Sequence, residues 1–435
     1  MELFGKNDEQ GCPVKNPIPT LIHLYSLAKQ RKNNLSVLLS KQYLADIQFI
    51  LRNATHPRFN SQSITNLLLS IVYLHGTWSD IQTAQLDGLL INTLHRHIDQ
   101  LTSQGTANTL WALAHLNFTY QDLQQQQLLH PLLHAIQRNS HQLNSQDTAN
   151  SLWALAQLGI TWQILQQQQL APLFFTVIQR NIATFKPQDL TNVLRAFAQY
   201  GITWNDLQQQ QLARPLCDAI RRDAHTFNHR HTTNMLWALS HLRLSWQDIK
   251  QWELDAIIIQ ILTRGIPEIS PIGTGYTLRA LTHFGLMWHD MQVMHLDVLL
   301  LEAIKRNATR LTPAGIVNTL QALVQFGFSW QAIQQCHLAQ PLMDAIYYHT
   351  KKFDYETVQQ LQKLSFWPQL PLPWDVKKHF HTLLAKSSAI PISVSPMKTV
   401  FNPVSAQPRM FAKSVTTHTS QDMSSLPSQA LKPLS

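Results

Sequence analysis

The sequence predicts an all-α, right-handed α-solenoid made of seven helical repeats of 42 residues, with capping helices at both ends. The main observation is a repeated stretch. It reads NTLWALAHLNFTYQDLQQQQL from Asn108, NSLWALAQLGITWQILQQQQL from Asn150 and NVLRAFAQYGITWNDLQQQQL from Asn192, and these starts lie 42 residues apart. A fixed period of this size is typical of helical units that each bury an apolar face against their neighbours.

Two columns of residues keep this register through seven units. The first is an anchor asparagine, replaced once by tyrosine: Asn66, Asn108, Asn150, Asn192, Asn234, Tyr276 and Asn318. The second is an aromatic residue after the anchor: Trp78, Tyr120, Trp162, Trp204, Trp246, Trp288 and Trp330. Because no insertion or deletion separates the anchors, we expect the seven units to share one structure. The aromatic column is expected to pack in the core.

The chain divides into five segments by period and composition. We expect a disordered N-terminus at 1–17, capping helices at 18–55, the solenoid at 56–345, a degenerate half-repeat with a cap at 346–386, and a disordered tail at 387–435. The tail is rich in Ser, Pro and Thr and has no periodicity, which is typical of disorder.

Within a unit, a first helix carries Leu and Ala at helical spacing. Glycines are expected to end it: Gly159, Gly201, Gly285 and Gly327. A Ser or Thr followed by Asp, as in Thr77 and Asp80, is a capping-box pattern that predicts the start of a second helix. Prolines in the second helix predict that it is divided in two: Pro131, Pro215 and Pro341. The glutamine tracts are expected to form a polar helix face, the alternative being a partner-binding patch.

Composition excludes several classes of protein. The net charge is +9, but it is concentrated at the two ends of the chain, so the repeats are nearly neutral. The three cysteines are far apart, which predicts neither a zinc site nor a disulfide framework. No segment has the apolar length of a membrane-spanning helix, so we expect no membrane insertion. The early acidic residues of MELFGKNDEQGCPVKNP argue against a secretory signal or a transit peptide, which favours a cytoplasmic location over an organellar one.

One face of the first helix carries amides, imidazoles, guanidinium groups and aromatic rings rather than core residues. Its candidate binding residues are Asn108, Trp111, His115, Asn150, Trp153, Gln157, Asn192, Arg195, Gln199, Asn234, Trp237, His241, Arg279, His283 and Gln321. Planar side chains stack on bases, and amides and arginine bond to base edges, so this chemistry suits single-stranded RNA. The alternative is that the asparagines form a ladder between units and that the tryptophans pack in the core.

A second regular column consists of arginines: Arg96, Arg138, Arg180, Arg222, Arg264 and Arg306. Cations near a helix C-terminus are stabilising, which favours a structural role. The alternative is a row that follows phosphate groups.

No arrangement of residues predicts catalysis. The histidines are scattered, no metal-binding or phosphate-loop motif is present, and no serine or cysteine has the setting of a nucleophile. We therefore expect a protein that is not an enzyme and that needs no cofactor and no metal.

The segments TANTLWALAHL, TANSLWALAQLGI and TTNMLWALSHL resemble the helical repeats of the octotricopeptide and heptatricopeptide class, found in FAST-kinase-domain-like and RAP-domain proteins. The resemblance covers the units from about 56 to 345 and implies an α-solenoid that binds RNA. The LWALA repeats also resemble those of repeat proteins in intracellular bacterial pathogens such as Legionella and Coxiella. That resemblance implies an effector delivered into a host cell by type IV secretion, with the C-terminal tail as its signal.

The expected function is binding of single-stranded RNA along the first-helix face by a monomeric protein. The alternative is a protein–protein interaction scaffold, which as a secreted effector would act on a host protein. The near-neutral repeats favour the scaffold, whereas the variable planar and amide residues favour RNA.

Overall fold

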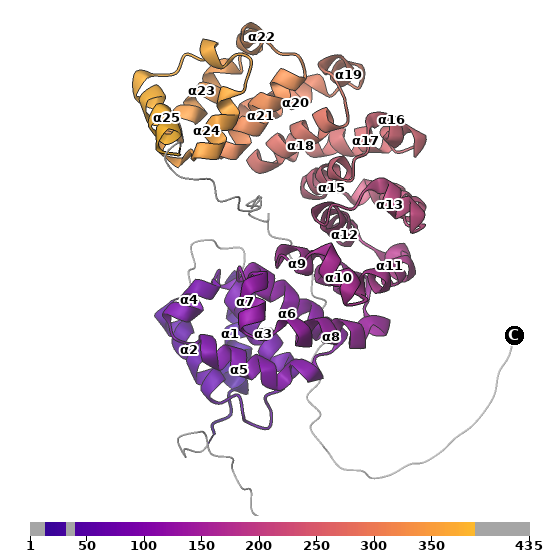
Figure 1. Cartoon of the computed structure of the whole chain (residues 1–435), viewed down its shortest axis with the longest axis vertical. Helices are drawn as coiled ribbons and strands as arrows, with labels where there is room; N and C mark the ends of the chain where they lie inside the picture. The colour runs from indigo at the N-terminus through magenta and orange to yellow at the C-terminus, as the bar shows by residue number, and fades with distance from the viewer. Residues whose placement is uncertain (1–13, 32–39, 388–435) are drawn as a thin grey trace, which may run out of the picture. The chain divides into compact units, whose positions relative to one another are not determined.

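The computed structural model describes residues 14–31 and 40–387, and these residues form only α-helices, 3-10 helices and the turns between them. The predicted all-α solenoid is confirmed (Figure 1). Each unit contains a first helix, a short helix, a third helix and a 3-10 turn. The predicted disorder at 1–17 and 387–435 falls almost entirely outside the described residues.

In every unit a first helix carries the anchor position. These first helices are α3 (Ser61–Tyr73), α6 (Ser103–His115), α9 (Ser145–Gln157), α12 (Pro187–Gln199), α15 (His229–His241), α18 (Pro271–His283) and α21 (Pro313–Gln325). A polar side chain caps most of them. Asn144, for example, accepts a hydrogen bond from the backbone N–H of Asp147, which satisfies one of the free donors at a helix start.

Each short helix starts at the aromatic column. The seven are α4 (Trp78–Thr83), α7 (Tyr120–Gln125), α10 (Trp162–Gln167), α13 (Trp204–Gln209), α16 (Trp246–Gln251), α19 (Trp288–Val293) and α22 (Trp330–Gln335). The predicted capping boxes are present: in the first of these helices, Thr77 caps the Asp80 N–H and the Asp80 carboxylate accepts from the Thr77 backbone. The aromatic rings pack against the next unit, as Trp78 does on Phe118 with ring centroids 4.3 Å apart.

The second helix is divided, as the prolines predicted. The third helices are α5 (Asp87–His97), α8 (Leu129–Asn139), α11 (Leu170–Asn181), α14 (Ala213–Asp223), α17 (Asp255–Gly265), α20 (Asp297–Asn307) and α23 (Ala339–Tyr348). The 3-10 turns that follow them are η1 (Ile98–Gln100), η2 (Ser140–Gln142), η3 (Ile182–Thr184), η4 (Ala224–Thr226), η5 (Ile266–Glu268), η6 (Ala308–Arg310) and η7 (Thr350–Lys352). Pro131 lies in the first turn of its helix, where its missing N–H leaves no bond unmade.

Two left-handed backbone positions shape every unit. Gly159, Gly201, Gly285 and Gly327 have positive φ at the end of the first helix, which confirms the predicted glycine stops. Units without this glycine place His75, Asn117 or Arg243 there. The second position follows the short helix and carries no glycine: Gln85, Gln127, Gln169, Gln211, Glu253, His295 and His337. The glutamine tracts therefore form the end of the short helix and its turn, rather than one continuous helix face.

Neighbouring first helices pack directly on one another, in the order α3, α6, α9, α12, α15, α18 and α21 (Figure 1). The row continues at both ends. Helix α1 (Ile18–Arg31), followed in the chain by α2 (Lys41–Arg52), packs on α3, and α24 (Tyr355–Gln362) packs on α21. After the 3-10 turn η8 (Trp367–Gln369), α25 (Trp374–Ser387) packs on α24. The terminal helices thus extend the row, although the segment boundaries predicted from the sequence remain predictions.

Candidate binding surface of the first helices

The large planar residues predicted to contact a ligand are buried. Trp111 is 3% exposed, Trp153 1% and Arg195 4%. Trp237 and the asparagines at 108, 150 and 192 are also buried, and Asn234 is half-buried. The prediction that the tryptophans and Arg195 present an open stacking surface is therefore wrong. The physical reason is that adjacent first helices pack side by side, so these columns lie in the joints between units rather than outside them.

The buried rings form contacts from unit to unit. The ring centroids of Tyr73 and Trp111 lie 6.3 Å apart, those of Trp111 and His115 lie 3.8 Å apart, and those of His115 and Trp153 lie 5.1 Å apart. Further along, the Arg195 guanidinium lies 5.9 Å from the centroid of the Trp237 ring. Such aromatic and cation–π pairs stabilise the joint beyond the area that they bury.

The next column, at the C-terminal end of the first helices, is half-buried in the middle units. Gln157 Nε2 donates to Gln199 Oε1 across one joint at 2.8 Å. His115 Nδ1 lies 2.9 Å from the Trp111 carbonyl oxygen, and burial lowers the His115 pKa to about 4. His115 is therefore neutral at physiological pH and acts as a packing group.

The same face becomes accessible in the later units. His241, Arg279 and His283 are exposed, and we call them the exposed cluster. The His241 ring stacks on Trp237 with centroids 4.1 Å apart and lies 5.9 Å from the His283 ring. Arg279 donates to Asn318 Oδ1 at 2.9 Å. Gln321 on the following first helix is half-buried.

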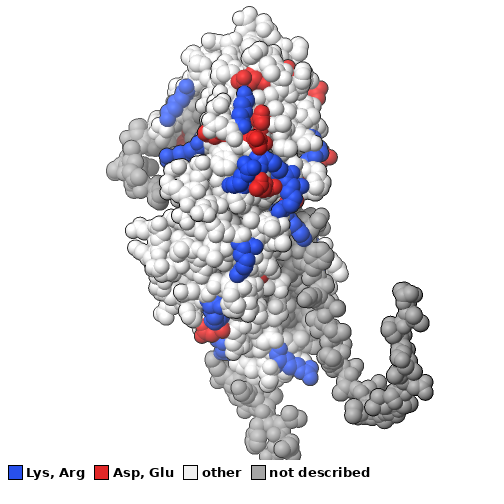
Figure 2. Space-filling model, turned by 90° about the vertical axis from the view of Figure 1, so that its right-hand side faces the viewer, with Lys and Arg blue, Asp and Glu red and all other residues white. Residues whose placement is uncertain are grey.

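Electrostatics distinguish this face from the rest of the molecule. The seven first helices contain only two acidic residues, Asp147 and Asp189, and both are buried. Burial lowers the pKa of His241 and of His283, and the Arg279 charge lowers both further, so these rings are neutral at pH 7. In contrast, on the face toward the short and third helices of the middle units, basic and acidic side chains lie interspersed (Figure 2). The exposed part of the first helices thus presents cations, imidazoles and amides without a carboxylate.

The arginine column has a structural role. Each of five arginines donates to backbone carbonyls of the preceding unit, at its 3-10 turn or directly after it. Arg180, for example, bonds to the Ser140 and Leu143 oxygens at 3.2 and 2.7 Å. The other four are Arg138, Arg222, Arg264 and Arg306. These bonds occupy the guanidinium groups, so the structure favours the structural alternative over a row that follows phosphates.

An asparagine beside this arginine was missed in the sequence. Asn181 Nδ2 donates to the Leu143 oxygen and to the Thr148 hydroxyl, at 2.8 and 3.0 Å. Asn139 and Asn307 make the same pair of bonds, one to a carbonyl at the end of the preceding unit and one to a threonine in the first helix of their own unit. We call these bonds of the arginine and the asparagine the clamp. The signal in the sequence that could have revealed it is the recurring Arg-Asn pair at the end of the third helix, together with a threonine at a constant position of the first helix.

Within the described residues, no metal site is indicated and the Cys217 thiol is unreactive. No group of three His, Cys, Asp or Glu side chains there is arranged to hold a metal ion. Cys217 is buried, and burial raises its pKa to about 12, which makes the thiolate rare at neutral pH. None of the helices in residues 14–31 and 40–387 has the length and apolarity required to cross a membrane.

These features define a helical-repeat protein. Six segments of the chain are similar to the family model described as "Protein of unknown function (DUF1601)": residues 36–68, 77–110, 119–152, 158–194, 200–236 and 284–320. Together the segments cover a little under half of the sequence, and five of the six run from just before a short helix into the next first helix. No curated protein matches the chain. The narrower resemblances to octotricopeptide-type repeats and to bacterial effectors remain predictions.

Proposed function

We propose that this chain is a non-enzymatic binding protein for single-stranded RNA, and that the contact lies on the first helices of the later units. One observation carries the proposal: the accessible part of the first-helix face has cations and planar imidazoles but no carboxylate. A polyanion is attracted to such a face, whereas an acidic residue at the same place would repel it.

The exposed cluster supplies the chemistry that single strands need. Arg279 can neutralise a phosphate or stack on a base, and the rings of His241 and His283 offer planar surfaces on adjacent units. Trp237 holds the His241 ring from beneath, which limits the rotamers of that ring. The binding residues of the proposal are therefore His241, Arg279, His283 and Gln321, and the buried tryptophans act by positioning them.

The test is fluorescence anisotropy with the full chain and a mixed-sequence single-stranded RNA pool at low and physiological salt. The triple variant His241→Ala, Arg279→Ala and His283→Ala should bind at least about tenfold more weakly, since each lost stacking contact costs about 1–3 kcal/mol. Its matched control is His130→Ala, Arg214→Ala and His134→Ala, which removes the same residue types from exposed positions on third helices. Equal affinities for the two triple variants would refute this binding face.

A protein-interaction scaffold is the second candidate function. Met287, Val293 and Val298 are exposed around the short and third helices of one unit, and exposed apolar side chains that gather in one region are typical of protein contacts. A photocrosslinking residue in place of Val293 should then capture a protein partner that the same residue in place of exposed Gln124 does not. If wild-type protein binds no RNA at either salt concentration, this second function takes precedence.

A cytoplasmic location, and secretion directed by the tail, are proposals from the sequence of the ends alone. Fusion of residues 388–435 to a translocation reporter tests the secretion signal. A reporter that stays in the producing cell would remove the effector interpretation.

A further inference from the structure

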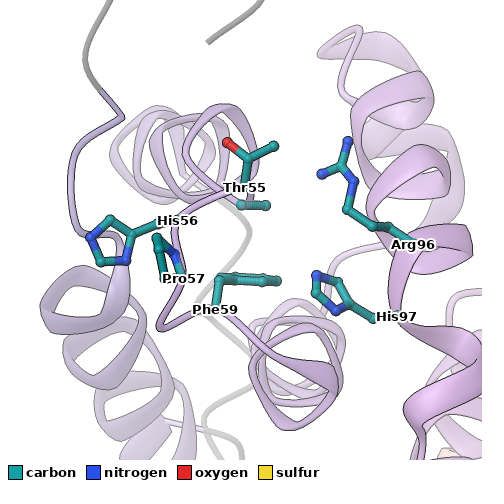
Figure 3. A pocket seen from close by; sticks show the side chains of 7 residues that line it. Thr55, His56, Pro57, Phe59, Arg96 and His97 are labelled. Atoms are coloured by element: carbon teal, nitrogen blue, oxygen red, sulfur yellow. The ribbon is translucent and has the colours of Figure 1, made fainter. Parts of the chain in front are cut away.

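The first joint of the row contains a cavity. It has a volume of about 440 Å³, within the ~300–1,000 Å³ range of small-ligand pockets. It lies between the turn that follows α2 and the end of α5. Thr55, Pro57 and Phe59 line it from the turn, and Arg96 and His97 line it from α5 (Figure 3).

The cavity exists where the usual clamp is incomplete. Arg96 belongs to the arginine column, yet it makes none of the carbonyl bonds that the five later arginines make. His97 occupies the position of the clamping asparagine, and Ile64 occupies the position of the threonine that this asparagine bonds. The joint therefore lacks the polar contacts that close its counterparts.

His97 is an under-bonded polar group at this site. Its side chain is 7% exposed, and its two buried ring nitrogens have no well-aligned hydrogen bond, the Ala54 backbone being the one group that interacts with the ring in this way. The ring packs on Phe59, with centroids 5.5 Å apart. Figure 3 shows Arg96 and His97 directed from α5 toward the turn. A buried polar group without a bond costs free energy, so a ligand that bonds to it is favoured.

The charge of the lining selects an anion. Arg96 is exposed and always cationic, Thr55 offers a hydroxyl, and none of the lining residues is acidic. The acidic residue that follows Arg96 and His97 in the sequence is Asp99, and its carboxylate lies 3.9 Å from the Arg138 guanidinium of the next unit. Burial lowers the pKa of His97 most, and the charge of Arg96 lowers it further. A hydrogen bond with the Ala54 backbone raises the pKa in part. The neutral imidazole supplies one N–H donor.

We infer that this cavity binds a phosphate monoester group, held by the Arg96 guanidinium, the Thr55 hydroxyl and the His97 ring. The three donors belong to two elements, and a tetrahedral dianion accepts from several directions at once, whereas a carboxylate accepts in one plane. The site is separate from the exposed cluster and does not depend on RNA binding.

The experiment is isothermal titration of the full chain with inorganic phosphate, methyl phosphate and acetate. Histidine labelled with carbon-13 reports in parallel on the His97 ring by NMR, and His97→Gln assigns its signal. Methyl phosphate should bind and shift that signal, and Arg96→Ala should weaken binding at least about tenfold, as expected for loss of a charge-assisted hydrogen bond. Arg96→Lys, which keeps the charge, should retain part of the affinity.

Two matched variants separate this site from other arginines. Arg180→Ala removes the same column position from a closed joint, and it should lower the melting temperature while methyl phosphate binding stays within twofold of wild type. Arg279→Ala should also leave methyl phosphate binding unchanged. The inference is overturned if the His97 signal does not move, if Arg96→Ala binds as tightly as wild type, or if acetate binds as tightly as methyl phosphate.

Discussion

Asp147 is a carboxyl group buried between first helices. It is 4% exposed, and burial raises its pKa to about 6, which hydrogen bonds from Asn144 and Ser103 only partly oppose. Its folded pKa is above the unfolded value, so its stabilising contribution is complete below pH 4 and is lost as the pH rises through about 6. At neutral pH the buried carboxylate is a cost to the fold.

Asp147→Asn should therefore stabilise the protein at pH 7.5. A shift of about two pKa units corresponds to about 3 kcal/mol, and the gain should disappear below pH 4, where both side chains are neutral. Thermal unfolding followed by circular dichroism at pH 7.5 and pH 4 checks this expectation. A variant that is less stable at pH 7.5 would show that the carboxylate makes a favourable interaction there.

Arg243 has a φ of 66°, at the position where four units have glycine. A left-handed conformation costs a residue with a Cβ about 1 kcal/mol, so Arg243→Gly should raise the free energy of unfolding by about that amount. The reverse change, Gly201→Ala, should lower it similarly. A Cβ at Gly201 meets no atom within 4 Å, so strain in the backbone would be the sole cause. Urea unfolding measures the free energy of unfolding of both variants. Changes of the same sign in the two would contradict the prediction.

At the scale of the helix, periodicity predicted the elements well because each boundary has a local chemical cause. The capping boxes, the glycine stops and the prolines all act within a few residues of the boundary that they set. The accessible face was predicted poorly. A helix in a row has buried flanks on two sides, so the spacing of Trp111 or Trp153 cannot distinguish a ring that faces a neighbour from one that faces solvent. The angle between adjacent helices decides this, and it depends on packing along the whole row.

At the joint between units, the contribution of the arginine clamp to stability can be measured. Arg180→Ala removes two hydrogen bonds to the preceding unit and leaves two carbonyls without that donor, which should cost about 1–3 kcal/mol. Arg214→Ala removes an exposed ion pair with Asp218 on one helix and should cost under about 1 kcal/mol. Chemical denaturation measures the free energy of unfolding of both variants. An equal loss of stability would mean that the clamp stabilises the protein no more than an exposed ion pair does.

For the molecule as a whole, the seven units repeat one order of helices. Deletion of 108–149 removes one period of 42 residues and joins Ala107 to Asn150, where Ala149 stood before. The variant should keep its helical signal per residue and unfold cooperatively at a somewhat lower temperature, because each unit depends mainly on its neighbours. Deletion of 108–128, half a period, should lose helical signal because it joins the wrong elements. Circular dichroism at 222 nm distinguishes the two deletions, and equal spectra would contradict a strictly periodic array.

The direction of the clamp also bears on how the chain is made. The clamping arginines of five units, and the asparagines of three of these, bond to carbonyls that precede them in the chain, as Arg180 and Asn181 do with Leu143. A protein leaves the ribosome N-terminus first. Each of these units, when newly synthesised, therefore brings the side chains that fasten it to the unit already outside the exit tunnel, and this part of the row can assemble one joint at a time, at the pace of translation.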